Sequence, residues 1–279
     1  MENNFQNKIL ITLLLLVSLL TATALQAQVA VTSDTTHYNL YTYIKVAPGM
    51  EANYLKLEKA FKKIHIAKKK AGDMQDWSLS SVVSPAGSSC EYNYVARNGL
   101  RGSKQLANYY EGVYMPKNWQ SLLTPAEVAL VNRTDQIRTI VKKEVWSSVE
   151  EVFADDWTKN AKVAVWNYFT EPAGKTQADH TKMEQDIWKP VHAARVKDGA
   201  MLGWVLIGMN LPFGASMPYN MATIDLYKDM NQYLTPWFDT YFTKIHPGKD
   251  VADLMKQTSA ATTLVKGEVR IIIDRLDWK

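Results

Sequence analysis

The pattern of apolar and polar positions gives the same order of elements twice along the chain. Residues 38–46 are rich in aromatic and β-branched side chains and end at a Pro-Gly pair, which predicts a strand followed by a turn. Apolar residues then recur at helical spacing over 51–70, and Gly72 is a typical stop for that helix. Two strands, further helical stretches and a closing strand complete this half, and the order returns from residue 163.

The remaining elements follow from the same periodicities. Thr124, Pro125 and Glu127 have the spacing of a capping box with proline in the first turn, so a helix is expected to begin there. The other expected elements of the first half are strands at 77–83, 92–96 and 139–149 and a helical stretch from Ser103. Those of the second half are strands at 163–170, 204–210, 219–227 and 267–276 and a helix at 177–197.

The two halves also share identical residues in register. A shift of 127 residues pairs thirteen identities over about fifty positions, including Tyr41/Tyr168, His65/His192, Trp77/Trp204 and Tyr92/Tyr219. Farther on, a shift of 124 aligns residues 139–145 with 263–269, both of the form Thr-x-Val-Lys-x-Glu-Val. So many matches at one offset indicate an internal duplication, and a duplication predicts one architecture for both halves.

Each half has the order β-α-β-β-α-β of a ferredoxin-like unit. Helices cover one face of such a sheet, and two tandem units can bury the other faces by packing sheet to sheet. The element order, the duplication and the shared closing strand resemble the dimeric α/β-barrel superfamily, and the chain also resembles uncharacterised exported bacterial proteins of this shape. The resemblance implies an α+β fold with ferredoxin-like repeats at 37–153 and 161–279, packed as an intrachain α/β-barrel pseudo-dimer. Such a chain is expected to be a monomer in solution.

Residues 1–27 are typical of a secretory signal peptide. Lys8 precedes an apolar run at 9–20, and small residues follow it up to Ala27. The run is shorter than the roughly 20 residues that a membrane span needs. We therefore expect cleavage after Ala24 or Ala27, a periplasmic or secreted protein, and no membrane span after cleavage.

Composition narrows the function classes only a little. The 32 basic and 28 acidic residues leave a formal charge of +4, which is too balanced to predict nucleic acid as a partner. Cys90 is the only cysteine of the sequence, so the chain cannot form an internal disulfide.

The helix histidines are the first candidate site residues. His65 and His192 each lie four residues after an aromatic side chain, Phe61 and Trp188, and thus one turn along the same helix face. Arg195 continues that face in the second half. This arrangement fits a polar site at the edge of a helix–sheet pocket, and it equally fits histidines that border the core.

The first strands supply the second group of candidates. Tyr41 and Tyr43 share one side of their strand, and Trp166 and Tyr168 share one side of theirs, because alternate residues face opposite sides. We expect all four to face the same side of the sheet. An aromatic interior of this kind can hold a flat apolar ligand, although a packed core has the same sequence pattern.

Metal and cofactor signals are weak. His180 and Glu184 lie four apart on a predicted helix, but two ligands are fewer than a zinc site requires, so no metal site is predicted. Nucleotide-binding glycine loops and the nucleophile elbow are absent from the sequence. Some members of the superfamily bind or degrade haem with a helix histidine, so non-covalent haem remains an open alternative to no cofactor.

Three hypotheses of function follow. The first is an exported protein that binds a small apolar or aromatic ligand without a permanent cofactor, through the strand aromatics with the helix histidines at the polar ends; its residues are Tyr41, Tyr43, Trp166, Tyr168, His65, Trp188, His192 and Arg195. The second is a monooxygenase or haem-linked oxidoreductase in which His192 is the functional histidine. The third is an envelope protein-interaction module. The sequence leaves open whether the protein is an enzyme.

Overall fold

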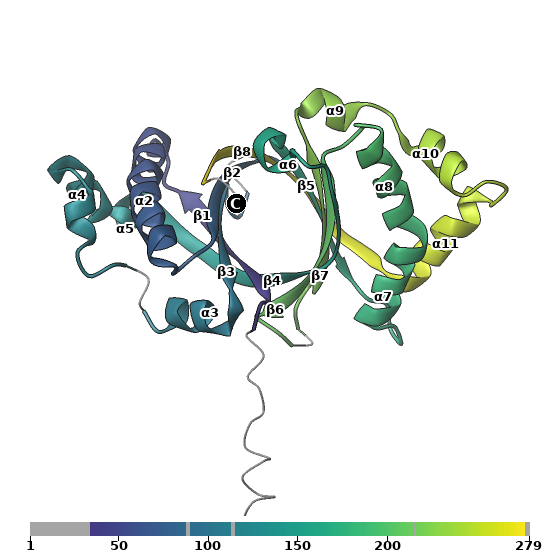
Figure 1. Ribbon diagram of the computed structural model, residues 1–279, viewed down its shortest axis with the longest axis horizontal. Helices are drawn as coiled ribbons and strands as arrows, with labels where there is room; N and C mark the ends of the chain where they lie inside the picture. The colour runs from purple at the N-terminus through teal and green to yellow at the C-terminus, as the bar shows by residue number, and fades with distance from the viewer. Residues whose placement is uncertain (1–33, 88–89, 113–114, 215, 277–279) are drawn as a thin grey trace, which may run out of the picture. The chain divides into compact units, whose positions relative to one another are not determined.

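A closed antiparallel barrel forms the centre of the protein, with helices packed outside it (Figure 1). The computed structural model describes residues 34–87, 90–112, 115–214 and 216–276. The strands run in the order β1-β3-β2-β8-β5-β7-β6-β4. Their bounds are β1 His37–Val46, β2 Asp76–Ser84, β3 Tyr94–Arg101, β4 Arg138–Phe153, β5 Val163–Thr170, β6 Gly203–Leu211, β7 Met221–Tyr227 and β8 Thr263–Arg275.

Two groups of helices flank the barrel on opposite sides (Figure 1). The first group is α2 Glu51–Ala71, α3 Gly102–Tyr110, the 3₁₀ turn Trp119–Leu122, α4 Pro125–Val131 and α5 Thr134–Ile137. The second group is α7 Gln177–Met183, a π-helical turn Glu184–Trp188, α8 Lys189–Lys197, α9 Met230–Leu234, α10 Phe238–Ile245 and α11 Val251–Ala261. The short helix α6 Trp157–Asn160 joins β4 to β5.

Most predicted elements are present with boundaries shifted by a few residues. Helix α2 ends at Gly72, which has the left-handed conformation (φ 80°) expected of a C-terminal stop. Helix α4 begins with the predicted capping box between Thr124 and Glu127. The single helix predicted over 177–197 is interrupted by a π-helical turn. Pro190 in the first turn of α8 explains the break, since proline has no N–H for the regular helical bond.

The halves of the sheet join edge to edge. Strands β4-β1-β3-β2 form one half and β8-β5-β7-β6 the other, and the joints are β2–β8 and β4–β6. The two sheets are therefore continuous, and their concave faces enclose one interior instead of stacking as separate layers. Closure leaves no free edge among the eight described strands.

Corresponding strand ladders have the same register and the same irregularities. The β1–β4 ladder pairs Tyr43 with Lys142 and then shifts, and the β5–β8 ladder pairs Tyr168 with Lys266 and then shifts. The β2–β3 and β6–β7 ladders also correspond, with Asp76 opposite Gly99 where Gly203 lies opposite Leu226.

These registers correct one detail of the sequence alignment. Tyr43 occupies the place of Tyr168, and Tyr41 that of Trp166, at an offset of 125 residues. The pairing of Tyr41 with Tyr168 at 127 is wrong by two residues. A slip of two preserves the side of the strand on which a residue lies, so alternation could not reveal it.

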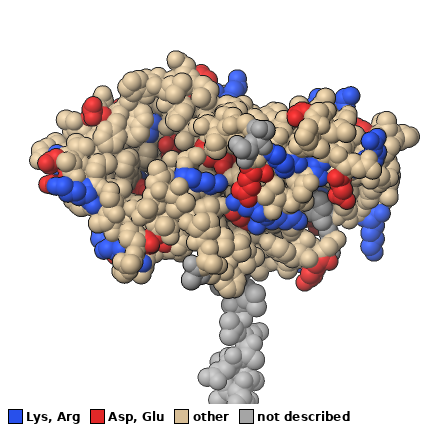
Figure 2. Space-filling view, turned by 180° about the vertical axis from the view of Figure 1, so that it is seen from behind, with Lys and Arg blue, Asp and Glu red and all other residues tan. Residues whose placement is uncertain are grey.

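The described residues contain no helix that is long and apolar enough to cross a membrane. The predicted signal peptide, 1–27, lies outside the described residues. On the face that Figure 2 shows, basic and acidic side chains are interspersed, and neither sign forms a continuous patch there.

Substitution of Gly99 should disturb the pairing of β2 with β3. A Cβ atom at Gly99 would lie 2.4 Å from Oδ1 of Asp76, a buried carboxylate that pairs with Arg97. We expect Gly99→Ala to lower the free energy of unfolding by about 1–3 kcal/mol, because the carboxylate must move in a packed region. Urea denaturation measures this change.

Gly267→Ala is the matched control, since its Cβ would meet no atom closer than 3.9 Å. Equal stabilities of Gly99→Ala and the unmodified protein would contradict the packing described here.

Candidate functional site

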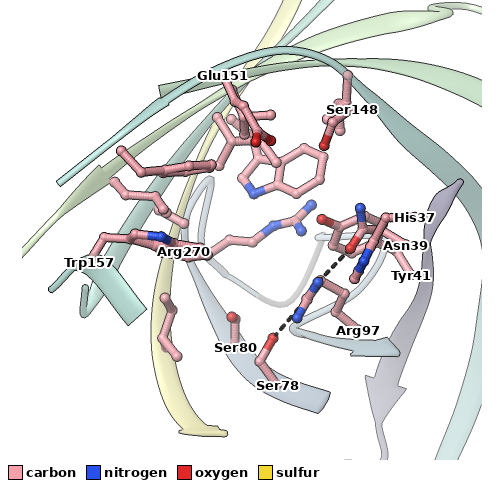
Figure 3. Close-up of a pocket in the computed structure, with 18 of the residues that line it drawn as sticks. His37, Asn39, Tyr41, Ser78, Ser80, Arg97, Ser148, Glu151, Trp157 and Arg270 are labelled. Carbon is pink, nitrogen blue, oxygen red and sulfur yellow. Dashed lines mark hydrogen bonds between the residues drawn. The ribbon is translucent and has the colours of Figure 1, made fainter. Parts of the chain in front are cut away.

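A cavity of about 800 Å³ occupies one end of the barrel interior (Figure 3). Residues of all eight strands contribute to its wall, together with Trp157 of α6 and Lys189 of α8. The apolar part of the wall consists of Tyr41, Val95, Val149, Phe153, Trp157, Ala164, Trp166, Val205, Ile207, Ile224, Leu226 and Ile272. The polar part includes His37, Asn39, Ser78, Ser80, Arg97, Ser148, Glu150, Glu151, Lys189 and Arg270.

Arg270 extends its guanidinium group toward the centre of the cavity (Figure 3). The group lies 4.1 Å from the ring centre of Trp166, in a cation–π contact. Nε donates to Glu268 Oε1 (2.5 Å), and Nη2 donates to the Tyr168 hydroxyl (2.6 Å). Nη1 has no hydrogen-bond partner among the residues that the structure describes.

The environment keeps Arg270 charged although the side chain is 2% exposed. Burial disfavours the charge, but the Glu268 carboxylate and the neighbouring phenols raise the pKa of Arg270 above its ordinary value. The cavity therefore contains a fixed cation with one N–H₂ group uncommitted.

The second guanidinium group at the cavity, that of Arg97, is already paired. Its Nη2 bonds to Asp76, its Nη1 donates to Asn39 Oδ1 (2.5 Å), and its Nε lies 3.5 Å from the Ser78 hydroxyl. His37 lies near the same carboxylate, with 4.0 Å between Nε2 and Oδ2 of Asp76. Burial lowers the pKa of His37, which favours a neutral imidazole.

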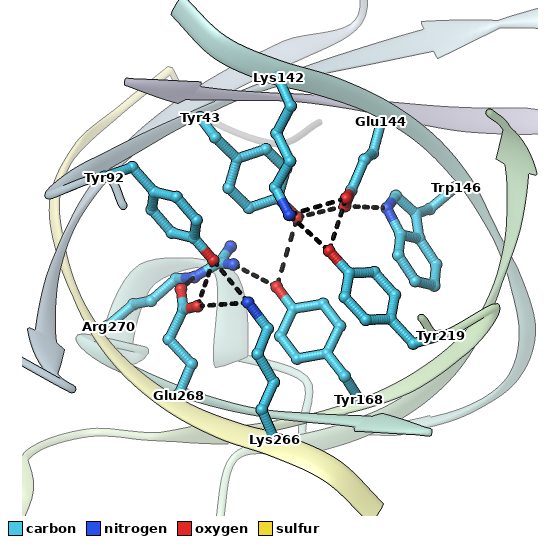
Figure 4. A network of polar contacts seen from close by, with 10 residues as sticks. All are labelled: Tyr43, Tyr92, Lys142, Glu144, Trp146, Tyr168, Tyr219, Lys266, Glu268 and Arg270. Carbon is cyan, nitrogen blue, oxygen red and sulfur yellow. Dashed lines mark hydrogen bonds and ion pairs between the residues drawn. The ribbon is translucent and has the colours of Figure 1, made fainter. Parts of the chain in front are cut away.

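The other half of the interior is filled by a network of phenols and ions, which we call the interior network (Figure 4). Its residues are Tyr43, Tyr92, Lys142, Glu144, Trp146, Tyr168, Tyr219, Lys266, Glu268 and Arg270.

The interior network contains one Lys-Glu-Tyr triad twice. In the first triad, Tyr219 donates to Glu144 Oε1 (2.7 Å), while Lys142 donates to the Tyr219 hydroxyl (2.6 Å) and lies 3.1 Å from the same carboxylate oxygen. Tyr219 comes from the second half of the chain, just before β7, and Lys142 and Glu144 come from β4 in the first half.

The second triad has the same geometry. Tyr92 donates to Glu268 Oε2 (2.6 Å), while Lys266 donates to the Tyr92 hydroxyl (2.8 Å) and lies 3.5 Å from Glu268 Oε2. Each carboxylate is thus bound by an ammonium group from its own strand and a phenol from the other half of the barrel.

Two tyrosines join the triads at the centre. The hydroxyls of Tyr43 and Tyr168 lie 3.3 Å apart, and Tyr43 donates to Glu144 Oε2 (2.6 Å). Burial is the largest cause that raises the pKa of both phenols, so both stay protonated at neutral pH.

The residue two positions after each glutamate differs between the two halves. Trp146 Nε1 donates to Glu144 Oε2 (3.1 Å), whereas Arg270 fills the corresponding place beside Glu268. Burial raises the pKa of Glu268, but the Arg270 charge and its hydrogen-bond donors outweigh burial and lower it overall.

The structure separates the predicted site residues into two groups. Tyr41 and Trp166 line the cavity, and Tyr43 and Tyr168 belong to the interior network, so the four strand aromatics share one side of the sheet as expected. The helix residues lie on the other side, between the helices and the outer face of the barrel.

His65 is packed between α2 and the sheet. Its ring stacks on Trp77 with 5.5 Å between centres, and the side chain borders a pocket of about 330 Å³ that also includes Glu58, Arg138 and Lys143. Burial is the main cause that lowers the pKa of His65 to about 3, with smaller effects of the nearby cations.

His192 is packed in the corresponding place beneath α8. It stacks between Trp188 (6.0 Å) and Trp204 (5.4 Å), and its Nδ1 lies 3.2 Å from Nη1 of Arg195. Arg195 is fully buried and stacks on Trp237 at 3.6 Å. Burial, and then the Arg195 charge, lower the pKa of His192 well below its ordinary value.

The prediction that His65 and His192 form the polar ends of the aromatic pocket is therefore wrong. The wall of the barrel lies between these histidines and the strand aromatics. The polar groups of the cavity come instead from the strands themselves, above all Arg97 and Arg270.

Neither helix histidine offers an open face to haem. A porphyrin needs an apolar slot beside the imidazole, but Trp188, Trp204 and Arg195 enclose His192. The pocket beside His65 has charged walls, which would lose their hydration against a porphyrin ring. The residues present do not fit this group at either histidine.

The interior network was missed by the sequence analysis, although part of its signal was visible. Tyr92/Tyr219 are identical pairs at offset 127, and Lys142/Lys266 and Glu144/Glu268 are identical pairs at offset 124. A lysine and a glutamate two positions apart lie on the same side of a strand, and their repetition in both halves indicates an interior ion pair. Arg97 and Arg270 had no such signal, because their counterparts are Ile224 and Trp146.

The comparisons with known proteins show the fold. A candidate monooxygenase from Fusobacterium nucleatum matches with TM-score 0.53 and 12% identity over 87% of this chain and 94% of that one. A candidate monooxygenase from Lactobacillus acidophilus matches with TM-score 0.50 and 13% identity, over 88% and 97%. A heme-binding protein from Thermus thermophilus matches with TM-score 0.47 and 10% identity, over 86% and 92%.

The predicted resemblance to the dimeric α/β-barrel superfamily is confirmed at the level of fold. The scan against protein-family models found no match, and neither did the search of curated proteins.

The buried helix histidine should make the protein sensitive to acid. His65 keeps a pKa of about 3 in the folded chain, against about 6.5 in an unfolded chain. The unfolded state alone takes up this proton as the pH falls below 6.5, so stability decreases on acidification. Between pH 7 and pH 5 His65 should account for a loss of about 2 kcal/mol in the free energy of unfolding.

Urea denaturation at the two pH values checks this expectation. His65→Gln should lose about 2 kcal/mol less than the unmodified protein between pH 7 and pH 5. An equal loss in both proteins would show that another group carries the acid sensitivity.

Proposed function

We propose that this protein binds a small, largely apolar or aromatic molecule inside the barrel. The observation that carries the proposal is the cavity of about 800 Å³, whose volume lies within the roughly 300–1,000 Å³ typical of ligand sites. Its lining combines twelve aliphatic or aromatic residues with ten polar or charged ones, and small-molecule sites likewise combine apolar walls with placed polar groups. The ring of Trp166 also lines the cavity, with the Arg270 guanidinium over it.

The monooxygenase alternative has support from the names of two structural neighbours with TM-scores of 0.50 or more, at identities of 12–13%. The interior network beside the cavity favours ligand binding over catalysis. The phenols of Tyr43 and Tyr168 are held protonated, and Glu268 is bound by Arg270, Tyr92 and Lys266. A general base needs an available proton acceptor, and these groups of the interior network are occupied; the neutral imidazole of His37 lies elsewhere in the lining, beside Asp76.

We further propose that the barrel is an intrachain pseudo-dimer of ferredoxin-like repeats, 37–153 and 161–279, and that the protein is exported. Matching ladder registers and shifts in the two halves support the pseudo-dimer. The signal-peptide pattern of residues 1–27 supports export. The protein would then bind its ligand as a monomer, in the periplasm or outside the cell.

Filling the cavity should abolish binding of a neutral probe. N-phenyl-1-naphthylamine is an uncharged aromatic amine whose fluorescence increases in apolar surroundings. Ala164 faces the cavity, so we expect Ala164→Phe to weaken binding of this probe at least tenfold by occupying its space. Fluorescence titration of purified mature protein gives the dissociation constants.

Ala126→Phe, at an exposed position on α4, is the matched control and should bind like the unmodified protein. Ile224→Phe fills the same cavity from β7 and serves if Ala164→Phe unfolds, as judged by circular dichroism. Unchanged affinity in a folded cavity-filling variant would contradict the proposed function.

A further inference from the structure

We infer that the ligand is a monoanion, an aromatic or apolar molecule with one carboxylate or similar oxyanion, whose acidic group binds to Nη1 of Arg270. This inference rests on the proposed function, because it names the chemistry of the molecule that the barrel cavity accepts. Charge, geometry and the difference between the two halves each support it.

The first argument is the charge of the interior network. Lys142, Lys266 and Arg270 are cations, and Glu144 and Glu268 are the carboxylates that face them. Three cations share two carboxylates, and Arg270 is the buried one, whereas Lys142 and Lys266 are partly exposed to solvent. Arg270 shares its counter-ion Glu268 with Lys266, and an anion in the cavity would supply a second counter-ion.

The second argument is the geometry of Arg270. Bonds from Nε and Nη2 and the contact with Trp166 fix the position of the guanidinium group. The remaining Nη1 group lies at the cavity. A donor held in place before binding loses little freedom when the ligand arrives, and hydrogen bonds between ions are among the strongest in proteins.

Arg97 does not offer a second anion site. Its three nitrogens bond to Asp76, Asn39 and Ser78, and the Asp76 carboxylate balances its charge. Of the two guanidinium groups in the lining, that of Arg270 therefore has the N–H₂ group available to an oxyanion, and the lining also contains the carboxylates of Glu150 and Glu151.

The third argument is the difference between the two halves of the interior. Trp146 lies where Arg270 lies in the other half, and each donates to the glutamate two residues before it. Only the Arg270 side therefore adds a cation at this position. The acidic end of the ligand should lie at Arg270 and its apolar body against Val205, Ile207, Ile224 and Leu226, which belong to β6 and β7.

Two probes of nearly the same shape test the inference. 8-Anilinonaphthalene-1-sulfonate carries one oxyanion, and N-phenyl-1-naphthylamine lacks it. We expect the unmodified protein to bind the sulfonate at least tenfold more tightly than the neutral amine. Arg270→Met should weaken sulfonate binding at least tenfold, and by a larger factor than it changes binding of the amine.

Two further variants serve as controls. Arg270→Lys keeps the charge and should retain part of the preference for the sulfonate. Lys142→Met removes one positive charge from the interior network without altering the cavity lining, so it should reduce sulfonate binding less than Arg270→Met does. Thermal melts confirm that each variant is folded.

The outcomes separate the inference from the proposed function. If both probes bind equally and Arg270→Met changes neither, the cavity takes neutral ligands and the inference is overturned. If Lys142→Met has the same effect as Arg270→Met, direct contact with Nη1 is overturned. If neither probe binds the unmodified protein, the proposed function itself fails.

Discussion

The need to satisfy two buried carboxylates determines how the interior of this barrel is built. Glu144 and Glu268 are 2% and 3% exposed, and each lies on the strand that links the two halves of the sheet. An ionised carboxylate in such a place is tolerated only when cations and hydrogen-bond donors surround it. The four central tyrosines and the two lysines meet this need, and they fill one end of the interior in doing so.

The cavity at the other end follows from the same requirement. With one end occupied by the interior network, the ring of Trp166 and the guanidinium of Arg270 become the floor of the remaining space. Small and branched side chains such as Ala164 and Val205 do not fill that space. The cavity therefore has a wall of apolar and polar residues and a charged floor, a combination that suits an amphipathic ligand.

The outer face of the sheet has a different role. His65 and His192 stack on equivalent tryptophans, Trp77 and Trp204, and both have lowered pKa values because they are buried. These paired histidines and tryptophans attach the first helix of each half to the barrel. This shared packing explains why the same residue types occur in both halves. It requires no catalytic or binding role of the histidines.

More of the fold than of the candidate site could be predicted from the sequence. Helical spacing, capping residues and strand alternation located the elements, because these patterns depend on neighbours within a few residues. The strand aromatics were also assigned to one side correctly. The helix histidines were assigned to the wrong compartment, because periodicity says which helix face a residue occupies but not on which side of a sheet the helix packs.

Arg270 shows why the remaining part of the site could not be predicted. Its importance depends on Glu268 two residues earlier, on Tyr168 and Trp166 from β5, and on the closure of the barrel around them. The duplicated lysines, glutamates and tyrosines could have been recognised as an interior ion network from their offsets. An unpaired position such as Arg270 becomes informative only when the strand registers are known.

A crystal structure of the protein soaked with 1-naphthoate would test the central claim most directly. We expect one naphthoate in the barrel, with its carboxylate within hydrogen-bond distance of Nη1 of Arg270 and its rings against the apolar wall. Naphthoate bound only between α2 and the outer face of the sheet, beside His65, would contradict the account, as would an interior closed by side chains.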